Sequence, residues 1–460
     1  MFFGRKQELK VLNELYKLKI FQMPVIYGRR RIGKTALITE FVKDKKVIFY
    51  TATEKSRKLN IENFGKAVMD VIDSSNSDLQ FKDFKQILER VFEYSLKNQI
   101  ILVIDEFPYL AKSDKSFSSI LQALIDKYEK TSKLYLILCG SSMSFMEKNV
   151  LGYKAPLYGR RTAQIKLKEF DFFEIREYFN KMSIEDFAKT YGTVGGTPKY
   201  FLQFSDSLNY EQNLKKCFLN PSAFLFEETS NLLKQEVRDE ALYNAIIYAI
   251  AKGSTKISEI STKVGTVIPV CNASIKNLIS LDLVEKQIPF GEKKSKKPLY
   301  KLSNNMFRFY YAFVQENISN IERGFSDDAY SYIKPKIDNY MGKIFEDICI
   351  SYLWKQKKNK KISFMDIGKW WGTDKVKRKE VDIDIMGKID NDKLLFCECK
   401  WHNELVPLSV YDELLEKSNL FNCKQKVYYI FSKKGFTEAL KSEAKKNKNI
   451  HLVAYKDMFR

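Results

Sequence analysis

The sequence predicts an α/β protein whose first part is built on a parallel sheet, and two observations lead to this. Residues 23–41, MPVIYGRRRIGKTALITEF, read as an apolar strand, a glycine loop and an amphipathic helix. Further apolar runs at residues 47–52, 100–104 and 134–139, and a strand expected at 162–167, alternate with helical patterns. Short apolar runs of this kind are typical of parallel strands that are buried on both faces.

The glycine loop matches a phosphate-binding motif, G-x-x-x-x-G-K-T, which ends in Gly33, Lys34 and Thr35. Glycine lacks a Cβ, so the backbone can point its N–H groups inward, and the following helix adds its positive dipole end. Lys34 would reach the β- and γ-phosphates, and the Thr35 hydroxyl would bind Mg²⁺. We therefore expect ATP and Mg²⁺ as cofactors. The expected nucleotide cradle consists of Gly28, Arg29, Arg30, Arg31, Ile32, Gly33, Lys34, Thr35 and Ala36.

Two acidic residues follow the buried strand at 100–104. Asp105 and Glu106 lie at its carboxyl end, where parallel sheets bind their ligands. We expect Asp105 to hold Mg²⁺ through a water and Glu106 to polarise the attacking water. The alternative, an acidic turn without a catalytic role, is less well supported because the pair follows a phosphate loop by about 70 residues.

Two later segments of the chain carry polar residues that could act at the same site. Ser141 and Ser142 end the strand at 134–139 and could bind the γ-phosphate or its water, a plain turn being the alternative. The segment PLYGRR presents Arg160 and Arg161. One of these could act as an arginine finger, within its own chain or from a neighbouring subunit. The pair could equally be surface charge.

Composition limits the class of protein. A chain of 460 residues suggests two to four domains, and 45% hydrophobic residues are enough for globular cores. No apolar run is long enough to span a membrane, and the charged start MFFGRKQELK does not resemble a signal peptide, so we expect a cytoplasmic protein with no membrane partner. Seven scattered cysteines and two histidines predict neither a disulfide framework nor a zinc site.

The formal net charge of +21 favours a polyanionic partner such as DNA. The alternative is a lysine-rich composition that only solvates the surface. Residues 236–315 read as three short helices and a hairpin with a charged tip, the pattern of a winged helix. The hairpin lysines would contact phosphates, although the third helix carries few base-reading side chains, and a protein-binding spacer is the other interpretation. These lysines are Lys293, Lys294, Lys296 and Lys297.

The last third of the chain combines a helix containing Glu346 with a basic segment and two strands. Between residues 355 and 379 there are ten Lys or Arg and two acidic residues, interleaved with Trp370 and Trp371 as in nucleic-acid-binding surfaces. The strand KEVDIDIM places Asp382 on a carboxylate face, and the returning strand LLFCECKW places Glu398 and Lys400 on one side. We expect Asp382, Glu398 and Lys400 to converge.

These patterns resemble two known protein families. GRRRIGKT, the IDE strand end, the Gly-Ser-Ser tip, PLYGRR and GGTPKYF together resemble the archaeal-type ATPases of the STAND group of P-loop NTPases. The resemblance implies an ASCE P-loop sheet, with a strand between the Walker A and Walker B strands. It also suggests a nucleotide-facing lid that turns at Gly195, Gly196 and Pro198.

The C-terminal pattern resembles the PD-(D/E)XK nucleases, which have a restriction-endonuclease-like α/β fold. The resemblance implies that Asp382 and Glu398 would hold Mg²⁺ or Mn²⁺ and that Lys400 would orient the attacking water. Many proteins of that fold bind without cutting, so cleavage stays open.

The sequence thus predicts a P-loop ATPase core (1–165), a helical lid (166–235), a winged helix (236–315) and a nuclease-like domain (316–460). The expected function couples ATP binding and hydrolysis to action on DNA, with metal-dependent cleavage as an open question and a homo-oligomer as one compatible state. The alternative is a STAND-like signalling or assembly switch whose C-terminal domain only binds nucleic acid or protein.

Overall fold

The computed structural model describes residues 2–76, 79–293, 295 and 298–460. Of the four predicted hairpin lysines, Lys294, Lys296 and Lys297 lie outside this part. The contacts divide the chain into two compact units. Unit 1 is Met1–Glu169 with Thr197–Lys199, and unit 2 is Phe170–Gly196 with Tyr200–Arg460.

Unit 1 alternates helices and strands as the sequence predicts. Its helices are α1 (Lys6–Lys17), α2 (Lys34–Val42), α3 (Arg57–Ile72), α4 (Phe84–Lys97), α5 (Phe107–Ser113), α6 (Phe117–Tyr128) and α7 (Met143–Phe145). Its strands are β1 (Pro24–Tyr27), β2 (Val47–Thr51), β3 (Ile100–Asp105), β4 (Leu134–Gly140) and β5 (Ala163–Lys166). Every residue of β1, β3 and β4 is buried, which explains why these strands are apolar without alternation.

The strands of unit 1 form one five-stranded sheet in the order β2-β3-β4-β1-β5. All the pairings are parallel. Strand β4 lies between β1, which leads into the phosphate loop, and β3, which ends in Asp105. The inserted strand expected from the family resemblance is therefore confirmed. The order brings the ends of β1, β3 and β4 to one edge of the sheet.

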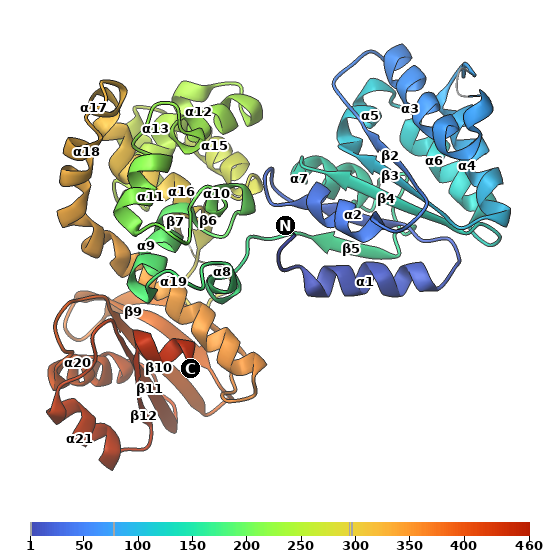
Figure 1. Ribbon diagram of the computed structural model, residues 1–460. Helices are drawn as coiled ribbons and strands as arrows, with labels where there is room; N and C mark the ends of the chain where they lie inside the picture. Colours follow the sequence, from blue (N-terminus) through green and yellow to red (C-terminus); the bar gives the residue numbers. More distant parts are fainter. Residues whose placement is uncertain (1, 77–78, 294, 296–297) are drawn as a thin grey trace. The chain divides into compact units, whose positions relative to one another are not determined.

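Helices cover both faces of this sheet (Figure 1). On one face, Leu12 of α1 and Leu37 and Phe41 of α2 pack against alternate residues of the strands. On the other face, Phe64 of α3, Phe84 of α4 and further aromatic side chains from α5 and α6 form a larger core. Burial of these apolar surfaces fixes the sheet that carries the loop.

Unit 2 begins with helices. They are α8 (Phe172–Tyr178), α9 (Ile184–Val194), α10 (Pro198–Phe201), α11 (Tyr210–Cys217), α12 (Phe224–Glu236), α13 (Glu240–Ala251), α14 (Ile257–Val264), α15 (Ile268–Ser280), α16 (Asn305–Phe309), α17 (Ile318–Glu322), α18 (Ser326–Ile333) and α19 (Ile337–Lys358). The first two residues of α10 belong to unit 1. Strands β6 (Val284–Gln287) and β7 (Leu299–Leu302) pair antiparallel after α15, so the predicted three helices and hairpin form.

The end of unit 2 is a second five-stranded sheet, in the order β12-β11-β10-β9-β8. Its elements are β8 (Asp366–Asp374), β9 (Lys379–Lys388), β10 (Lys393–Lys400), α20 (Leu408–Ser418), β11 (Gln425–Ser432), α21 (Glu438–Lys446) and β12 (Ile450–Ala454). Strands β8, β9 and β10 are antiparallel, whereas β10, β11 and β12 are parallel. Phe396 of β10 packs with Leu414 of α20 and Leu440 of α21.

Among the described residues, no helix is both long and apolar enough to cross a membrane.

Candidate functional site

The phosphate loop, residues 28–35, connects β1 to α2 in unit 1, and its shape requires both glycines. Gly28 has φ 156°, and a Cβ there would lie 2.6 Å from the Leu167 carbonyl oxygen. Gly33 has φ 91° in the left-handed region and directly precedes α2. Side chains at these positions would strain the backbone or displace β5, so the loop geometry follows from the sequence motif.

Lys34 is the first residue of α2 and lies inside the loop. Its Nζ donates to the carbonyl oxygens of Gly28 at 2.9 Å and Arg29 at 3.1 Å. Burial lowers the pKa of Lys34, although the charges of Glu106 and Asp105 act in the opposite direction. The ammonium is therefore held by dipoles of the loop rather than by an ion pair, and an incoming phosphate would favour its charged form.

Thr35 and Asp105 form the second part of the site. The hydroxyl of Thr35, in the loop, donates to the carboxylate of Asp105, at the end of β3, at 2.9 Å. Asp105 is 3% exposed, and its other oxygen accepts the backbone N–H of Glu106 at 3.0 Å. A hydroxyl and a carboxylate oxygen at this distance are the ligand types that Mg²⁺ prefers. The donor set therefore fits a magnesium ion.

Glu106 adopts a left-handed conformation, with φ 52°. Its carboxylate accepts two hydrogen bonds from Ser141, one from the hydroxyl at 2.8 Å and one from the backbone N–H at 3.2 Å. Ser141 follows β4, the neighbour of β3 in the sheet. The sequence assigned Ser141 to the γ-phosphate or its water, whereas in this structure its hydroxyl fixes the orientation of Glu106.

The side chains of two loop arginines, Arg29 and Arg30, contact other parts of unit 1. Arg29 is buried, pairs with Glu169 and donates to the Thr197 hydroxyl at 2.6 Å. Arg30 donates to the Tyr109 hydroxyl at 3.1 Å. Arg31 has φ 69°. The backbone N–H groups of this loop, Lys34 and the helix dipole of α2 are groups that it can offer to a nucleotide.

The segment predicted as a lid reaches this loop. The Lys199 backbone N–H donates to the Arg31 carbonyl oxygen at 3.5 Å, and a Cβ at Gly33 would lie 3.7 Å from Pro198. The side of the loop next to α2 is thus covered by residues 197–199. Arg5, just before α1, adds a third contact, because its guanidinium donates to the carbonyl oxygens of Ile32 at 3.2 Å and Lys168 at 2.7 Å.

The two candidate finger arginines precede β5, near the edge of the sheet where β1 begins. Arg160 and Arg161 precede β5, whose first residue, Ala163, pairs with Pro24 at the start of β1. The phosphate loop follows the other end of β1. Arg160 is also held by Asp126 of α6, with donor–acceptor distances of 2.7 Å and 2.6 Å. Both forms of the arginine-finger assignment, within the chain or on a neighbouring subunit, stay predictions.

The predicted acidic cluster in unit 2 is neutralised by lysines. Lys369 of β8 lies between three carboxylates, 3.2 Å from Glu346 of α19, 3.5 Å from Asp382 and 3.9 Å from Asp384. Glu398 of β10 is 6% exposed. It accepts from Lys400 at 2.7 Å and from Lys417 of α20 at 3.3 Å. Glu346, Lys369, Asp382, Asp384, Glu398, Lys400 and Lys417 are called the lysine–carboxylate cluster below.

Asp384, rather than the predicted Asp382, is the aspartate closest to Glu398 in the strand register. Ile385 faces Cys397, so Asp384 comes level with Glu398, and Asp382 lies two residues further along β9. One Asp384 oxygen accepts the Cys399 backbone N–H at 2.8 Å. Burial raises the pKa of Asp384 to about 7, assisted by the negative charges of Glu398 and Glu346. Asp382 is 58% exposed and contacts Lys369 instead.

No group of three or more His, Cys, Asp or Glu side chains within the described part of the chain is arranged to hold a metal ion. In the cluster, Glu346, Asp382 and Glu398 each already have at least one ammonium neighbour. Glu398 and Lys400 contact each other, as expected. Asp382 does not take part in that contact and lies near Lys369 instead.

Comparison with known proteins identifies the family. A family model described as an ATPase domain predominantly from Archaea matches residues 2–204, and one described as archaeal and bacterial proteins of unknown function matches residues 310–417. An uncharacterised protein of Methanocaldococcus jannaschii is 34% identical over 442 residues, which cover 94% of this chain and 96% of that protein. The chain belongs to this family of archaeal P-loop ATPases.

Two further proteins are similar to this ATPase. An uncharacterised ATP-binding protein of the same archaeon is 43% identical over 47 residues, 10% of this chain and 80% of that protein. Among solved structures, the Walker-type ATPase of Pyrococcus abyssi aligns with a TM-score of 0.52 and 18% identity, covering 67% of this chain and 96% of that one. At this identity the likeness shows a shared fold.

The sequence did not reveal the role of several residues in the ATPase's site. Arg5, Glu169 and Thr197 contact the loop from positions 27 to 168 residues away in the chain. Lys369 and Lys417 enter the lysine–carboxylate cluster from β8 and α20. Asp384 had a visible signal, since the two aspartates of VDID share one face of the strand.

Proposed function

We propose that this ATPase hydrolyses ATP at the phosphate loop of unit 1 and uses the nucleotide state to control binding of DNA by unit 2. The observation that carries the first half is the arrangement of Lys34, Thr35, Asp105 and Glu106 at one edge of a parallel sheet, where all four interact through short hydrogen bonds or charge. Catalysis of phosphoryl transfer depends mainly on such positioning and electrostatic stabilisation.

Each residue has a separate task in this proposal. The loop N–H groups and Lys34 bind the β- and γ-phosphates, while Thr35 and Asp105 hold Mg²⁺, which when bound neutralises charge that develops on the phosphates. Glu106 orients and polarises the attacking water. Ser141 positions Glu106 through its two hydrogen bonds. A charged lysine inside a water-poor loop is worth more in the transition state than the same group on the surface.

The DNA half of the proposal rests on charge and on the elements of unit 2. Three helices, α13, α14 and α15, precede the β6–β7 hairpin, which is the element order of a winged helix. At the start of α15, Val267 is 64%, Ile268 51% and Val270 43% exposed, so the residues that would meet base edges are apolar. We therefore propose contacts to phosphates rather than direct base readout.

The C-terminal sheet supports a nuclease-like fold as part of this proposal. A helix, three antiparallel strands, a helix and a further strand follow one another as α19, β8, β9, β10, α20 and β11. The proposed segments keep the boundaries 1–165, 166–235, 236–315 and 316–460. Arg160 or Arg161 acting on a neighbouring copy is compatible with a homo-oligomer. Mn²⁺ at the C-terminal site is not part of the proposal.

A second candidate function follows from the lysine–carboxylate cluster. Because Glu346, Asp382 and Glu398 each have a lysine partner, the C-terminal domain is suited to binding without cutting, as a STAND-like switch would require. In that case the ATPase is the only enzyme in the chain.

The coupling is tested with Glu106→Gln, which we expect to bind ATP while hydrolysing it about 10²-fold more slowly. Fluorescence anisotropy measures the affinity of the full chain for labelled duplex DNA with ATP, with ADP and without nucleotide. We expect the ATP-bound variant and the nucleotide-free protein to differ at least severalfold. Equal affinity in all three states would refute coupling to DNA while leaving ATP hydrolysis intact.

Cleavage is tested separately. The full chain is incubated with linear, circular and single-stranded DNA and Mg²⁺ or Mn²⁺, beside the double variant Glu398→Gln, Lys400→Ala. Cutting by the parent alone would establish a nuclease. Retention of DNA without cutting by either protein would favour the switch.

A further inference from the structure

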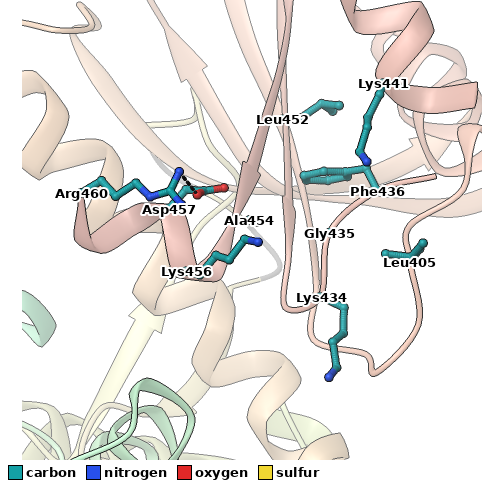
Figure 2. A pocket seen from close by; sticks show the side chains of 10 residues that line it. All are labelled: Leu405, Lys434, Gly435, Phe436, Lys441, Leu452, Ala454, Lys456, Asp457 and Arg460. Atoms are coloured by element: carbon teal, nitrogen blue, oxygen red, sulfur yellow. Dashed lines mark ion pairs between the residues drawn. The ribbon is translucent and has the colours of Figure 1, made fainter. Parts of the chain in front are cut away.

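The hollow beside the ends of β11 and β12 does not gather its cations. Figure 2 shows that the Lys434 side chain points away from Lys456, although both residues line the same space of about 440 Å³. Arg460, in the same lining, pairs with Asp457 at 2.9 Å. An anion in this hollow would therefore not meet two ammonium groups together. A denser group of cations lies elsewhere in the C-terminal sheet, in the turn between β8 and β9.

The ladder of β8 with β9 continues past the pairing of β9 with β10. Strand β10 pairs with β9 from Lys388 to Ile385, whereas β8 and β9 stay paired as far as Asp374 and Lys379. The last part of this hairpin is therefore a two-stranded ribbon. Its end has the sequence DKVKRK, and these residues, 374–379, are called the ribbon tip below.

The backbone of the ribbon tip is held in place by local contacts. The Asp374 carboxylate accepts the backbone N–H groups of Val376 at 2.8 Å and of Lys377 at 3.1 Å. Arg378 adopts a left-handed conformation, with φ 53°, just before β9 begins. Lys377 also forms an ion pair with Glu416 of α20. A partner would therefore meet a preorganised turn, and less conformational entropy would be lost on binding.

The ribbon tip carries positive charge that its own aspartate does not neutralise. It contains four basic residues and one acidic residue, whose carboxylate already accepts backbone N–H groups. Lys375, Arg378 and Lys379 are exposed, and none of them forms an ion pair with another described residue. The next acidic residue of β9, Glu380, lies opposite Thr373 on the other face of the ribbon from Lys379. The tip therefore favours a polyanion as its partner.

Val376 lies among these cations and is 91% exposed, the largest exposed fraction of any large hydrophobic side chain in the described part of the chain. A single exposed valine is ordinary on a protein surface. Between unpaired cations, it matches a partner that offers apolar edges between rows of phosphates. The major groove of duplex DNA has this character and admits a two-stranded β-ribbon. A membrane fits less well, because one valine buries too little apolar area to hold a protein at a bilayer.

We propose that the ribbon tip binds duplex DNA, with Lys375, Arg378 and Lys379 on phosphates and Val376 in the groove between them. This inference rests on the DNA half of the function proposed above, and it names an element of unit 2 that makes the contact. Phosphate contacts position a protein on the duplex without reading its sequence. The ribbon tip would therefore add affinity for DNA of any sequence.

The test measures how DNA affinity depends on salt in the nucleotide-free full chain, so the result does not depend on coupling to ATP. Fluorescence anisotropy gives the Kd for a labelled duplex of random sequence between roughly 0.05 and 0.2 M salt. Each neutralised phosphate contributes about 0.9 to the slope of log K against log salt. The triple variant Lys375→Gln, Arg378→Gln, Lys379→Gln should therefore lower the slope by about 2 to 3 and weaken binding at least about tenfold.

The matched control removes three cations at another place in the same domain. Lys445 and Lys446 end α21 and Lys448 precedes β12, and all three are exposed. Replacing each of them by Gln changes the net charge of the chain by the same amount. The slope for this control should stay close to that of the parent, because these lysines lie outside the ribbon.

Val376→Ser tests the apolar part of the inference. It should weaken binding about threefold to tenfold and leave the slope unchanged, because an apolar contact releases no counterions. Thermal unfolding of each variant confirms that the fold is kept. We expect this because the replaced side chains are exposed and make no ion pair among the described residues.

Three results would overturn the inference and leave the function proposed above intact. The first is an unchanged slope and affinity in the ribbon variant while the parent binds DNA. The second is an equal loss in the control, which would mean that only net charge matters. The third is binding of phosphatidylserine vesicles by the parent that Val376→Ser abolishes while DNA affinity is unchanged, which would assign the tip to a membrane. Absence of DNA binding by the parent would instead refute the DNA half of the proposed function together with this inference.

Discussion

Lys34 in unit 1 and Lys369 in unit 2 are both largely buried lysines near carboxylates, yet their pKa values shift in opposite directions. Burial lowers the pKa of Lys34, whose Nζ is held by two backbone carbonyl oxygens. Burial also lowers the pKa of Lys369. The negative charges of Glu346, Asp384 and Asp382 raise this pKa by more than burial lowers it, so the net shift is upward. Similar residue types thus produce two different sites.

The carboxylates show the same difference. Asp105 and Glu106 accept hydrogen bonds from a threonine hydroxyl, a serine hydroxyl and backbone N–H groups, which leave their negative charge in place. Glu398 is instead neutralised by two lysines. Neutral partners orient a carboxylate for an added cation, whereas ammonium partners replace that cation. This contrast distinguishes the donor set of unit 1, which fits magnesium, from the lysine-paired carboxylates of the lysine–carboxylate cluster.

The largest expected effect is that of Lys34→Ala. Loss of the ammonium removes the charge that stabilises the phosphates in the transition state, so ATP turnover should fall by roughly 10³-fold or more. Release of inorganic phosphate by the purified full chain measures this. Lys43→Ala, at the exposed end of the same helix, is the matched control. Turnover in Lys34→Ala equal to the parent would show that the phosphate loop is not the catalytic site.

A smaller effect is expected for Asp384→Asn and depends on pH. Because the folded-state pKa of Asp384 is raised to about 7, above its unfolded value, the folded protein binds the extra proton and its stability falls as pH rises between about 4 and 7. At pH 8 the variant should therefore be more stable by on the order of 1–3 kcal/mol, and its stability should change less with pH.

Thermal unfolding in EDTA between pH 5 and 8 measures the Asp384 effect. Asp382→Asn is the control on the same strand, where the side chain is 58% exposed and little desolvation is relieved. If the stability of the parent and of Asp384→Asn changed with pH in parallel, the ionised form of Asp384 would not be destabilised by its surroundings.

Ser141→Ala should have the smallest effect. It removes the hydrogen bond from the serine hydroxyl to Glu106 and leaves the backbone N–H bond in place, so ATP turnover should fall about threefold to tenfold. Affinity for ATP should hardly change, since the serine acts through Glu106. Ser142→Ala is the control, because no cap hydrogen bond is formed by its side chain. A loss of ATP affinity instead of turnover would indicate that Ser141 contacts the nucleotide.

The sequence was sufficient for the parts of the molecule that short-range patterns determine. Gly28, Gly33 and Lys34 predicted the loop because glycine geometry and helix start are local, and burial on both faces predicted β3 and β4. The strand between the Walker A and Walker B strands was expected from the resemblance to a family and is confirmed by the position of β4. The role of Arg160 stays open, because sequence does not say at which edge of the sheet a residue lies.

Contacts that depend on register or on long-range packing could not be predicted. Whether Asp382 or Asp384 lies level with Glu398 changes with a two-residue shift of β9, and the alternation of apolar residues is the same in both cases. Lys369 and Lys417 come from elements whose packing the sequence does not encode locally.

The contacts of Arg5 and Arg29 have a consequence for the order of folding. Arg29 of the phosphate loop gains its partners only when Glu169 and Thr197 reach it. Arg5, which contacts Ile32 of the loop, binds Lys168, so the contacts with residues 168–197 span sequence separations of 140 to 168 residues. Closing such long chain loops is entropically unfavourable and slow compared with forming a helix or a neighbouring strand pair. During synthesis, the sheet can therefore begin to assemble while the loop still lacks its last contacts. We expect nucleotide binding to appear only after residues 168–197 have been synthesised and have reached the loop.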